Sequence, residues 1–233
     1  SKLWYFIHSD NDPYCPLEHA QYLQSQIGGT LIVLKDQKHF SVGTFGEAYR
    51  QFPFLFNLIA DNAMTSQDVT HLYQTMQDQG VSLWLDGGWG VDALLGKQTR
   101  AHGDVDVVVQ KKDLSTLDSY LRDAGYFDIM TGDRSPHNYV LGNTDGLFVD
   151  IHVIELDEHG NGIYGPIEDG VMFEAASLSG VGSIDGVTVQ CISAEWVVKF
   201  HSGYELREKD IQDVTAVCAQ FGIEVPEEVR KAS

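Results

Sequence analysis

The sequence predicts an α+β fold, in which a mixed β-sheet is followed by helices at the C-terminal end of the chain. Three observations carry this prediction: β-branched or apolar runs at residues 81–85 and 105–109, an amphipathic repeat after Thr65, and two closing helical patterns. The chain has 233 residues, 43% of them hydrophobic, which is enough for one large domain or two small ones. We therefore expect a folded protein with a substantial core.

The expected elements separate into two blocks near residue 63, and we expect two units, residues 1–62 and 63–233. In the first unit, apolar residues 3–7 and 31–34 predict two strands around a helix at 20–27 that Gly28 and Gly29 close. Apolar residues 54–59 predict a second helix. The first unit therefore has a β-α-β-α order.

The second unit begins with a helix that Thr65 and Ser66 cap and Gly80 ends, because apolar residues recur at helical spacing between them. A strand at 81–85, a Gly87-Gly88 turn, a short helix at 91–95 and a strand at 105–109 follow. The remaining expected elements are a helix at 114–121, a hairpin of 137–141 with 147–154, a strand at 187–192, and helices at 194–201 and 211–221.

The charge of the chain limits its partners. Fifteen Lys and Arg residues stand against 34 Asp and Glu residues, a formal net charge of −19. Such a charge repels nucleic acids and anionic membranes, so we expect neither as a partner, and a nucleotide would need metal ions to offset the field. Three widely spaced cysteines without a C-x-x-C pair, and no membrane-length apolar run, favour a reduced cytoplasmic protein.

Two carboxylates begin the strand at residues 105–109. Asp104 and Asp106 point to the same side of a strand, about 7 Å apart, and two like charges at this spacing favour a cation such as Mg²⁺ between them. Asp150 lies on another expected strand and joins them if the two strands are neighbours. The alternatives are a solvated strand edge for the first two acids and an outward-facing position for Asp150.

The paired glycines Gly87 and Gly88 stand between a strand and a helix. Without side chains, they leave backbone N–H groups and a helix N-terminus open to an anion such as a phosphate. The alternative is a turn with no ligand.

Residues 81–109 resemble the nucleotidyltransferase superfamily with the DNA polymerase β type of fold, whose signature is a Gly-Gly turn, an Asp-x-Asp and a later third acid. Residues 84–100, WLDGGWGVDALLGKQTR, are similar to lincosamide nucleotidyltransferases and more loosely to aminoglycoside 2''-nucleotidyltransferases. The resemblance covers about residues 65–229 and includes Asp150-Ile151-His152, Cys191-Ile192-Ser193 and residues 200–206 with Asp210 and Asp213.

The resemblance implies a Mg²⁺-dependent transfer of a nucleoside monophosphate, AMP from ATP, to a hydroxyl of a small antibiotic, foremost a lincosamide, with release of pyrophosphate. It implies that Gly87 and Gly88 hold the triphosphate, that Asp104 and Asp106 bind Mg²⁺, and that Asp150 is the general base and a further metal ligand. The alternative is a non-catalytic nucleotide-binding or toxin–antitoxin module with the same fold.

Other polar residues near these motifs have two interpretations each. Arg100 and His102 precede the acidic pair and either contact phosphates or anchor the loop. His201, Tyr204 and Glu205 either line the acceptor side or pack along a helix with their polar ends outward.

Residues 1–62 resemble the C-terminal part of a small serine α/β-hydrolase, in which Asp12 and His39 match the acid and histidine of a triad. No G-x-S-x-G nucleophile motif occurs in the chain, so hydrolysis would need a serine from a partner chain. We expect an accessory or oligomerising role, with a homo-oligomer as one outcome. The bare edge of such a fragment must be covered by the second domain, another chain or the fragment itself.

Overall fold

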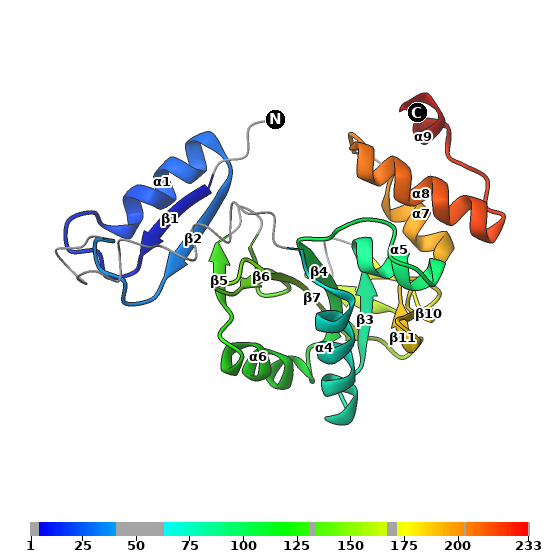
Figure 1. Cartoon of the computed structure of the whole chain (residues 1–233), viewed down its shortest axis with the longest axis horizontal. Coiled ribbons are helices and arrows are strands. Elements are labelled where there is room, and N and C mark those ends of the chain that lie inside the picture. Colours follow the sequence, from blue (N-terminus) through cyan, green and yellow to red (C-terminus); the bar gives the residue numbers. More distant parts are fainter. Residues whose placement is uncertain (1–4, 41–62, 131–133, 167–171, 203, 233) are drawn as a thin grey trace.

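The computed structural model describes residues 5–40, 63–130, 134–166, 172–202 and 204–232. Its strands form one mixed sheet, in the order β1-β2-β5-β6-β7-β4-β3-β11-β10, with β8 and β9 added beside β7 (Figure 1). The strands are β1 (Tyr5–Ser9), β2 (Thr30–Leu34), β3 (Leu83–Asp86), β4 (Asp104–Gln110), β5 (Phe127–Met130), β6 (Asn138–Gly142), β7 (Phe148–Leu156), β8 (Gly162–Tyr164), β9 (Met172–Phe173), β10 (Gly180–Ile184) and β11 (Val187–Cys191). The mixed sheet confirms the predicted α+β class.

Helices cover both faces of this sheet (Figure 1). They are α1 (Leu17–Ile27), α4 (Ser66–Asp78), α5 (Gly87–Leu95), α6 (Leu114–Asp123), α7 (Ala194–Phe200), α8 (Glu208–Phe221) and α9 (Glu227–Ala232). Thr65 caps α4 as predicted, with a reciprocal capping box to Asp68. Each helix in the described part of the chain is too short or too polar to traverse a bilayer.

Alternate side chains of the central strands point to opposite faces of the sheet and pack into two different cores. Val105, Val107 and Val109 of β4 pack with α4 and α6, whereas Val108 packs with α7 and α8 on the other face. Asp104 and Asp106 share the face of Val108. The sequence alternation therefore directs both acids toward the C-terminal helices.

The N-terminal unit adds two strands to the edge of this sheet. β1 and β2 are parallel, and β2 pairs antiparallel with β5 through Leu31–Met130 and Ile32–Ile129. Ile32 and Ile129 lie together in a small core of their own. The edge of β2 is therefore covered by the second unit, which is one of the three ways in which we expected the bare edge to be covered. The boundary at residue 62 and the hydrolase resemblance stay predictions.

The structure differs from the expected elements in two ways. Gly87 and Gly88 are the first turn of α5 rather than a turn before it, because the carboxylate of Asp86 accepts the Gly87 N–H at 2.8 Å and caps the helix. The short strands β5, β8, β9 and β10 were not predicted, nor was helix α9. The helix expected at residues 54–59 lies outside the described residues.

Candidate active site

Three aspartates lie side by side on adjacent strands. The register pairs Asp86 of β3 with Asp106 of β4, and Asp106 with Asp150 of β7. Neighbouring strands are about 4.8 Å apart, and paired residues point to the same face, so the three carboxylates converge. The strands that carry Asp106 and Asp150 are therefore neighbours, as the prediction required, and Asp86 is an acid that the prediction did not include.

Asp104 lies two residues before Asp106 on the same face of β4, at the exposed start of the strand. Although its side chain meets solvent, its charge acts on Asp106. The structure thus brings all three predicted acids to one end of one sheet face.

Burial and repulsion raise the pKa of Asp106 well above its ordinary value. Burial is the largest cause, and the carboxylates of Asp104, Asp86 and Asp150 add to it. The ammonium of Lys209, on α8, opposes the rise. A group in this position is stabilised either by a proton or by a cation, and carboxylate oxygens are the ligands that Mg²⁺ prefers. The donor set therefore fits a divalent metal ion.

His152 joins these acids and was missed as a site residue. It lies two residues after Asp150 on β7, and Asp106, Asp150 and His152 each offer a ligand atom within 4.8 Å of the others. The period of two along the strand was the signal that placed it on the same face.

The glycines at the start of α5 allow this helix to approach the acids. A Cβ on Gly87, whose φ is +52°, would overlap the carboxylate of Asp106. A Cβ on Gly88 would overlap the ring of His102 and lie 2.7 Å from Nη2 of Arg100. Glycine is therefore required at both positions for the N-terminus of α5 to lie against the site.

His102 is buried in the loop that leads into β4. Its Nε2 contacts Oδ2 of Asp92 at 2.5 Å, and both side chains are 1% exposed. Oδ1 of Asp92 accepts from the Oγ1 of Thr99 at 2.6 Å and from its backbone N–H at 2.9 Å. For His102, this geometry favours the loop-anchoring interpretation over a phosphate contact.

Arg100 joins the same loop to α8. Its guanidinium donates to both carboxylate oxygens of Asp213, at 2.8 and 3.4 Å. Burial lowers the pKa of Arg100, but the Asp213 carboxylate, with smaller effects from Asp92 and Asp104, raises it overall. Arg100 therefore anchors α8 while its guanidinium stays beside Gly88, near the acids.

Basic side chains at the start of α8 face the acidic strands. Arg207 immediately precedes the helix; the carboxylate of Asp210 accepts its backbone N–H at 2.9 Å and the guanidinium N–H groups at 3.0 and 3.2 Å. The hydrogen bond to Asp210 is the main cause that raises the pKa of Arg207, and the charge of Asp104 contributes. With Lys209 and Arg100, this residue places positive charge opposite the carboxylates of an otherwise acidic protein.

The polar residues after α7 are not on a helix, which corrects one expectation. α7 ends at Phe200, and Tyr204 and Glu205 lie exposed in the connection to α8. The Nδ1–H of His201 donates to the backbone oxygen of Val197 at 2.7 Å. His201 thus closes the end of α7.

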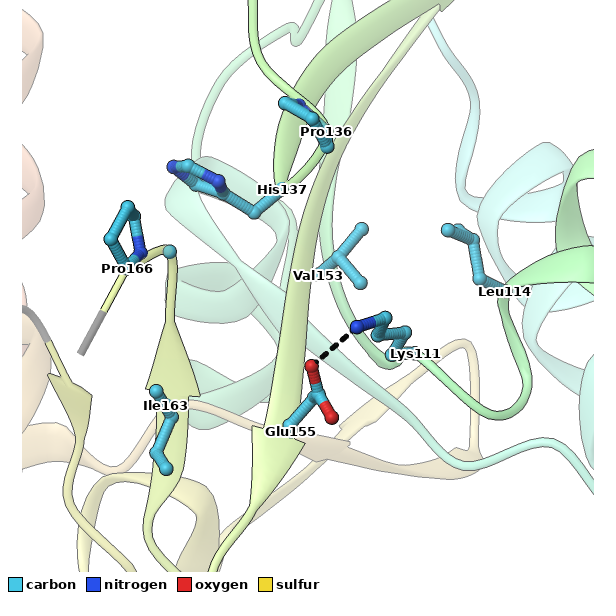
Figure 2. Close-up of a pocket in the computed structure, with 9 residues that line it drawn as sticks. Lys111, Leu114, Pro136, His137, Val153, Glu155, Ile163 and Pro166 are labelled. Atoms are coloured by element: carbon cyan, nitrogen blue, oxygen red, sulfur yellow. Dashed lines mark hydrogen bonds and ion pairs between the residues drawn. The ribbon is translucent and has the colours of Figure 1, made fainter.

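A separate cavity of about 480 Å³ lies on the opposite face of β7 (Figure 2). Val153 and Glu155 line it, and these residues alternate with the face that carries Asp150 and His152. Lys111 and Glu155 form an ion pair of 2.6 Å across one side of it. Because of this placement, the cavity is separate from the acid cluster.

Comparison with known proteins gives a family model that matches within the second unit, and related proteins. The family model described as aminoglycoside-2''-adenylyltransferase matches residues 68–217. A lincosamide resistance protein of Staphylococcus haemolyticus is 32% identical over 155 residues, which are 66% of this chain and 94% of that protein. A 2''-aminoglycoside nucleotidyltransferase of Klebsiella pneumoniae is 38% identical over 47 residues, 19% of this chain and 27% of that protein.

Two solved structures have a similar fold. The lincomycin-bound crystal structure of the lincosamide antibiotic adenylyltransferase LnuA is 30% identical, with a TM-score of 0.61 over 70% of this chain and all of that one. The structure of ANT(2'')-Ia in complex with adenylyl-2''-tobramycin is 20% identical, with a TM-score of 0.54 over 72% of this chain and 95% of that one. These matches confirm the predicted resemblance and the fold of the second unit.

Proposed function

The chain belongs to the aminoglycoside-2''-adenylyltransferase family and is a nucleotidyltransferase, and we propose that it transfers AMP from ATP to a hydroxyl of a lincosamide antibiotic and releases pyrophosphate. The choice of a lincosamide rests on the relative in Staphylococcus haemolyticus and on the lincomycin-bound structure, which cover 66% and 70% of this chain. The observation that carries the proposed chemistry is the register that aligns Asp86, Asp106 and Asp150 beside the N-terminus of α5.

The predicted acids and glycines each have a role in this proposal, whereas His102 anchors the loop before β4. The carboxylates of Asp104, Asp106 and Asp150 hold Mg²⁺, which supplies charge stabilisation for the attacking and leaving oxygens of an in-line displacement. The backbone N–H groups of Gly87 and Gly88, at a helix N-terminus, bind triphosphate oxygens. Asp150 accepts the proton of the attacking hydroxyl.

The positive groups opposite the acids complete the nucleotide side of the site. Arg100, Arg207 and Lys209 each interact electrostatically with Asp104 or Asp106. A triphosphate that approaches a protein of net charge −19 is repelled by its overall field. We therefore assign these three side chains to local attraction of the phosphates, with Arg100 also holding α8 in place.

Mass spectrometry tests this function directly. The full chain with Mg²⁺ and ATP should add an adenylyl mass to lincomycin, and GTP and an aminoglycoside in parallel reactions define the specificity. Asp106→Asn should lower turnover by about 10²–10⁴-fold, the range for removing a group that acts in the transition state. Asp123→Asn is the matched control, because Asp123 is exposed at the end of α6.

Two outcomes would contradict the proposal. Nucleotide binding without transfer to any drug would favour the non-catalytic module, and full turnover in Asp106→Asn would exclude the assigned site.

A further inference from the structure

His152 lies beside two of the three proposed metal ligands, Asp106 and Asp150. It is half-buried on β7, and its ring lies on the same sheet face as Asp150 and Asp106. The ligand atoms of these three side chains lie within 4.8 Å of one another, which is a separation that one metal ion can bridge. The proposed function assigns Asp104, Asp106 and Asp150 to the metal but gives His152 no role.

The orientation of the His152 ring is set by a neighbouring tyrosine. Its Nδ1 lies 3.2 Å from the hydroxyl of Tyr164, on β8. The Tyr164 ring is itself held edge-on against Phe173, with centroids 5.7 Å apart, and against His137, at 5.0 Å. A histidine that donates Nδ1–H to such a partner has its Nε2 lone pair available, and metal-binding histidines are commonly oriented in this way.

The chemistry of this donor set differs from that of carboxylates alone. Mg²⁺ prefers oxygen ligands in octahedral geometry, whereas imidazole nitrogen binds first-row transition metals well. We propose that Nε2 of His152, with the carboxylates of Asp106 and Asp150, forms a mixed nitrogen–oxygen site for a first-row transition-metal dication, represented by Mn²⁺. This inference rests on the proposed function, because it takes the two carboxylates to be metal ligands.

Pulsed electron paramagnetic resonance of Mn²⁺ detects the bound nitrogen without an activity measurement. The metal-free full chain, titrated with Mn²⁺, should show nitrogen modulation that changes when histidine is labelled with ¹⁵N. His152→Gln should abolish the modulation and weaken Mn²⁺ binding by at least the roughly 10–100-fold that the loss of an outer-shell partner of a metal ligand costs. Binding of Mg²⁺, which does not depend on the imidazole, should change much less.

His137→Gln is the matched control. His137 contacts the same tyrosine ring but lies outside the three-residue cluster, so its replacement should leave the nitrogen modulation intact. Unfolding curves of both variants show whether the fold is kept. Tyr164→Phe removes the hydroxyl beside Nδ1, and it should retain the modulation while Mn²⁺ binding weakens; unchanged binding would overturn the positioning role of Tyr164.

The outcomes separate this inference from the proposed function. Antibiotic adenylylation by a protein whose bound Mn²⁺ lacks nitrogen modulation, or modulation that persists in His152→Gln, would overturn the His152 assignment alone. Nitrogen modulation that His152→Gln removes, in a protein that modifies no antibiotic, would support the assignment and overturn the proposed function. Absence of Mn²⁺ binding would overturn the metal site.

Discussion

Each of the two units contains an aspartate–histidine pair, and the surroundings of these two pairs differ. Asp92 and His102, in the second unit, are both 1% exposed, and Asp92 also binds Thr99. Asp12 and His39, in the first unit, are 2.8 Å apart, but the His39 side chain is 50% exposed. The same two residue types therefore form a buried anchor in one place and a surface pair in the other.

The position of each pair determines which part of the molecule its loss would affect. His102 lies against Gly88 and directly precedes β4, so the buried pair holds the loop that leads to Asp104 and Asp106. Asp12 and His39 follow the ends of β1 and β2, in the unit that pairs with the edge strand β5. We expect damage to the first pair to reach the active site and damage to the second to stay local.

Breaking the buried pair should have the largest effect on stability. Asp92→Ala leaves His102 and both donors of Thr99 without their acceptor, and removing one partner of a buried pair costs about 3–5 kcal/mol. Urea unfolding of the variant against the wild-type chain measures this loss. A loss below about 1 kcal/mol would mean that water replaces the carboxylate without cost.

A methyl group at Gly88, against the loop that carries Arg100 and His102, should have the next largest effect on stability. Gly88→Ala places a Cβ against the His102 ring and the Arg100 guanidinium, and overpacking of this kind costs about 1–3 kcal/mol. It should also weaken ATP binding, measured by calorimetry, since α5 must move away from the acids. Gly103→Ala is the control, because its Cβ would meet no atom within 4 Å and its backbone needs no left-handed conformation.

The pH dependence of stability tests the unpaired charge at Asp106. The pKa of Asp106 is raised in the folded chain, so the folded state binds more protons than the unfolded state. Asp106 therefore lowers the free energy of unfolding increasingly as the pH rises above the ordinary pKa of an aspartate. In EDTA, Asp106→Asn should therefore unfold at a higher temperature than wild type at pH 7, with the difference disappearing toward pH 3. A constant difference at all pH values would contradict the raised pKa.

Breaking the surface pair should have the smallest effect. Burial raises the pKa of Asp12, but hydrogen bonds from His39, Tyr14 and Cys15 lower it overall. The stabilising effect of ionised Asp12 is therefore present at neutral pH, and it is lost as the pH falls below the ordinary pKa of an aspartate. His39→Ala should change the unfolding temperature slightly and leave Mn²⁺ binding and adenylylation at wild-type levels; a loss of either would connect the first unit to the active site.

Local patterns predicted much of the second unit. The Thr65 cap, the β-branched residues of β4 and the glycine after α8 each act within a few residues, and the corresponding elements are present. The common face of Asp104 and Asp106 also follows from the strand period. The short strands β5 and β8 were missed, because a strand of three or four residues carries too little pattern and is stabilised by its neighbours.

The sequence by itself determined the fold class, the resemblance to nucleotidyltransferases and the three acids proposed for the metal, because these depend on composition and on residues close together in the chain. Only the tertiary structure decided that Asp86 and His152 join those acids and that His102 is a buried anchor. It also decided that β2 extends the sheet through β5. These facts depend on strand register and on contacts between distant residues, which many other residues set together.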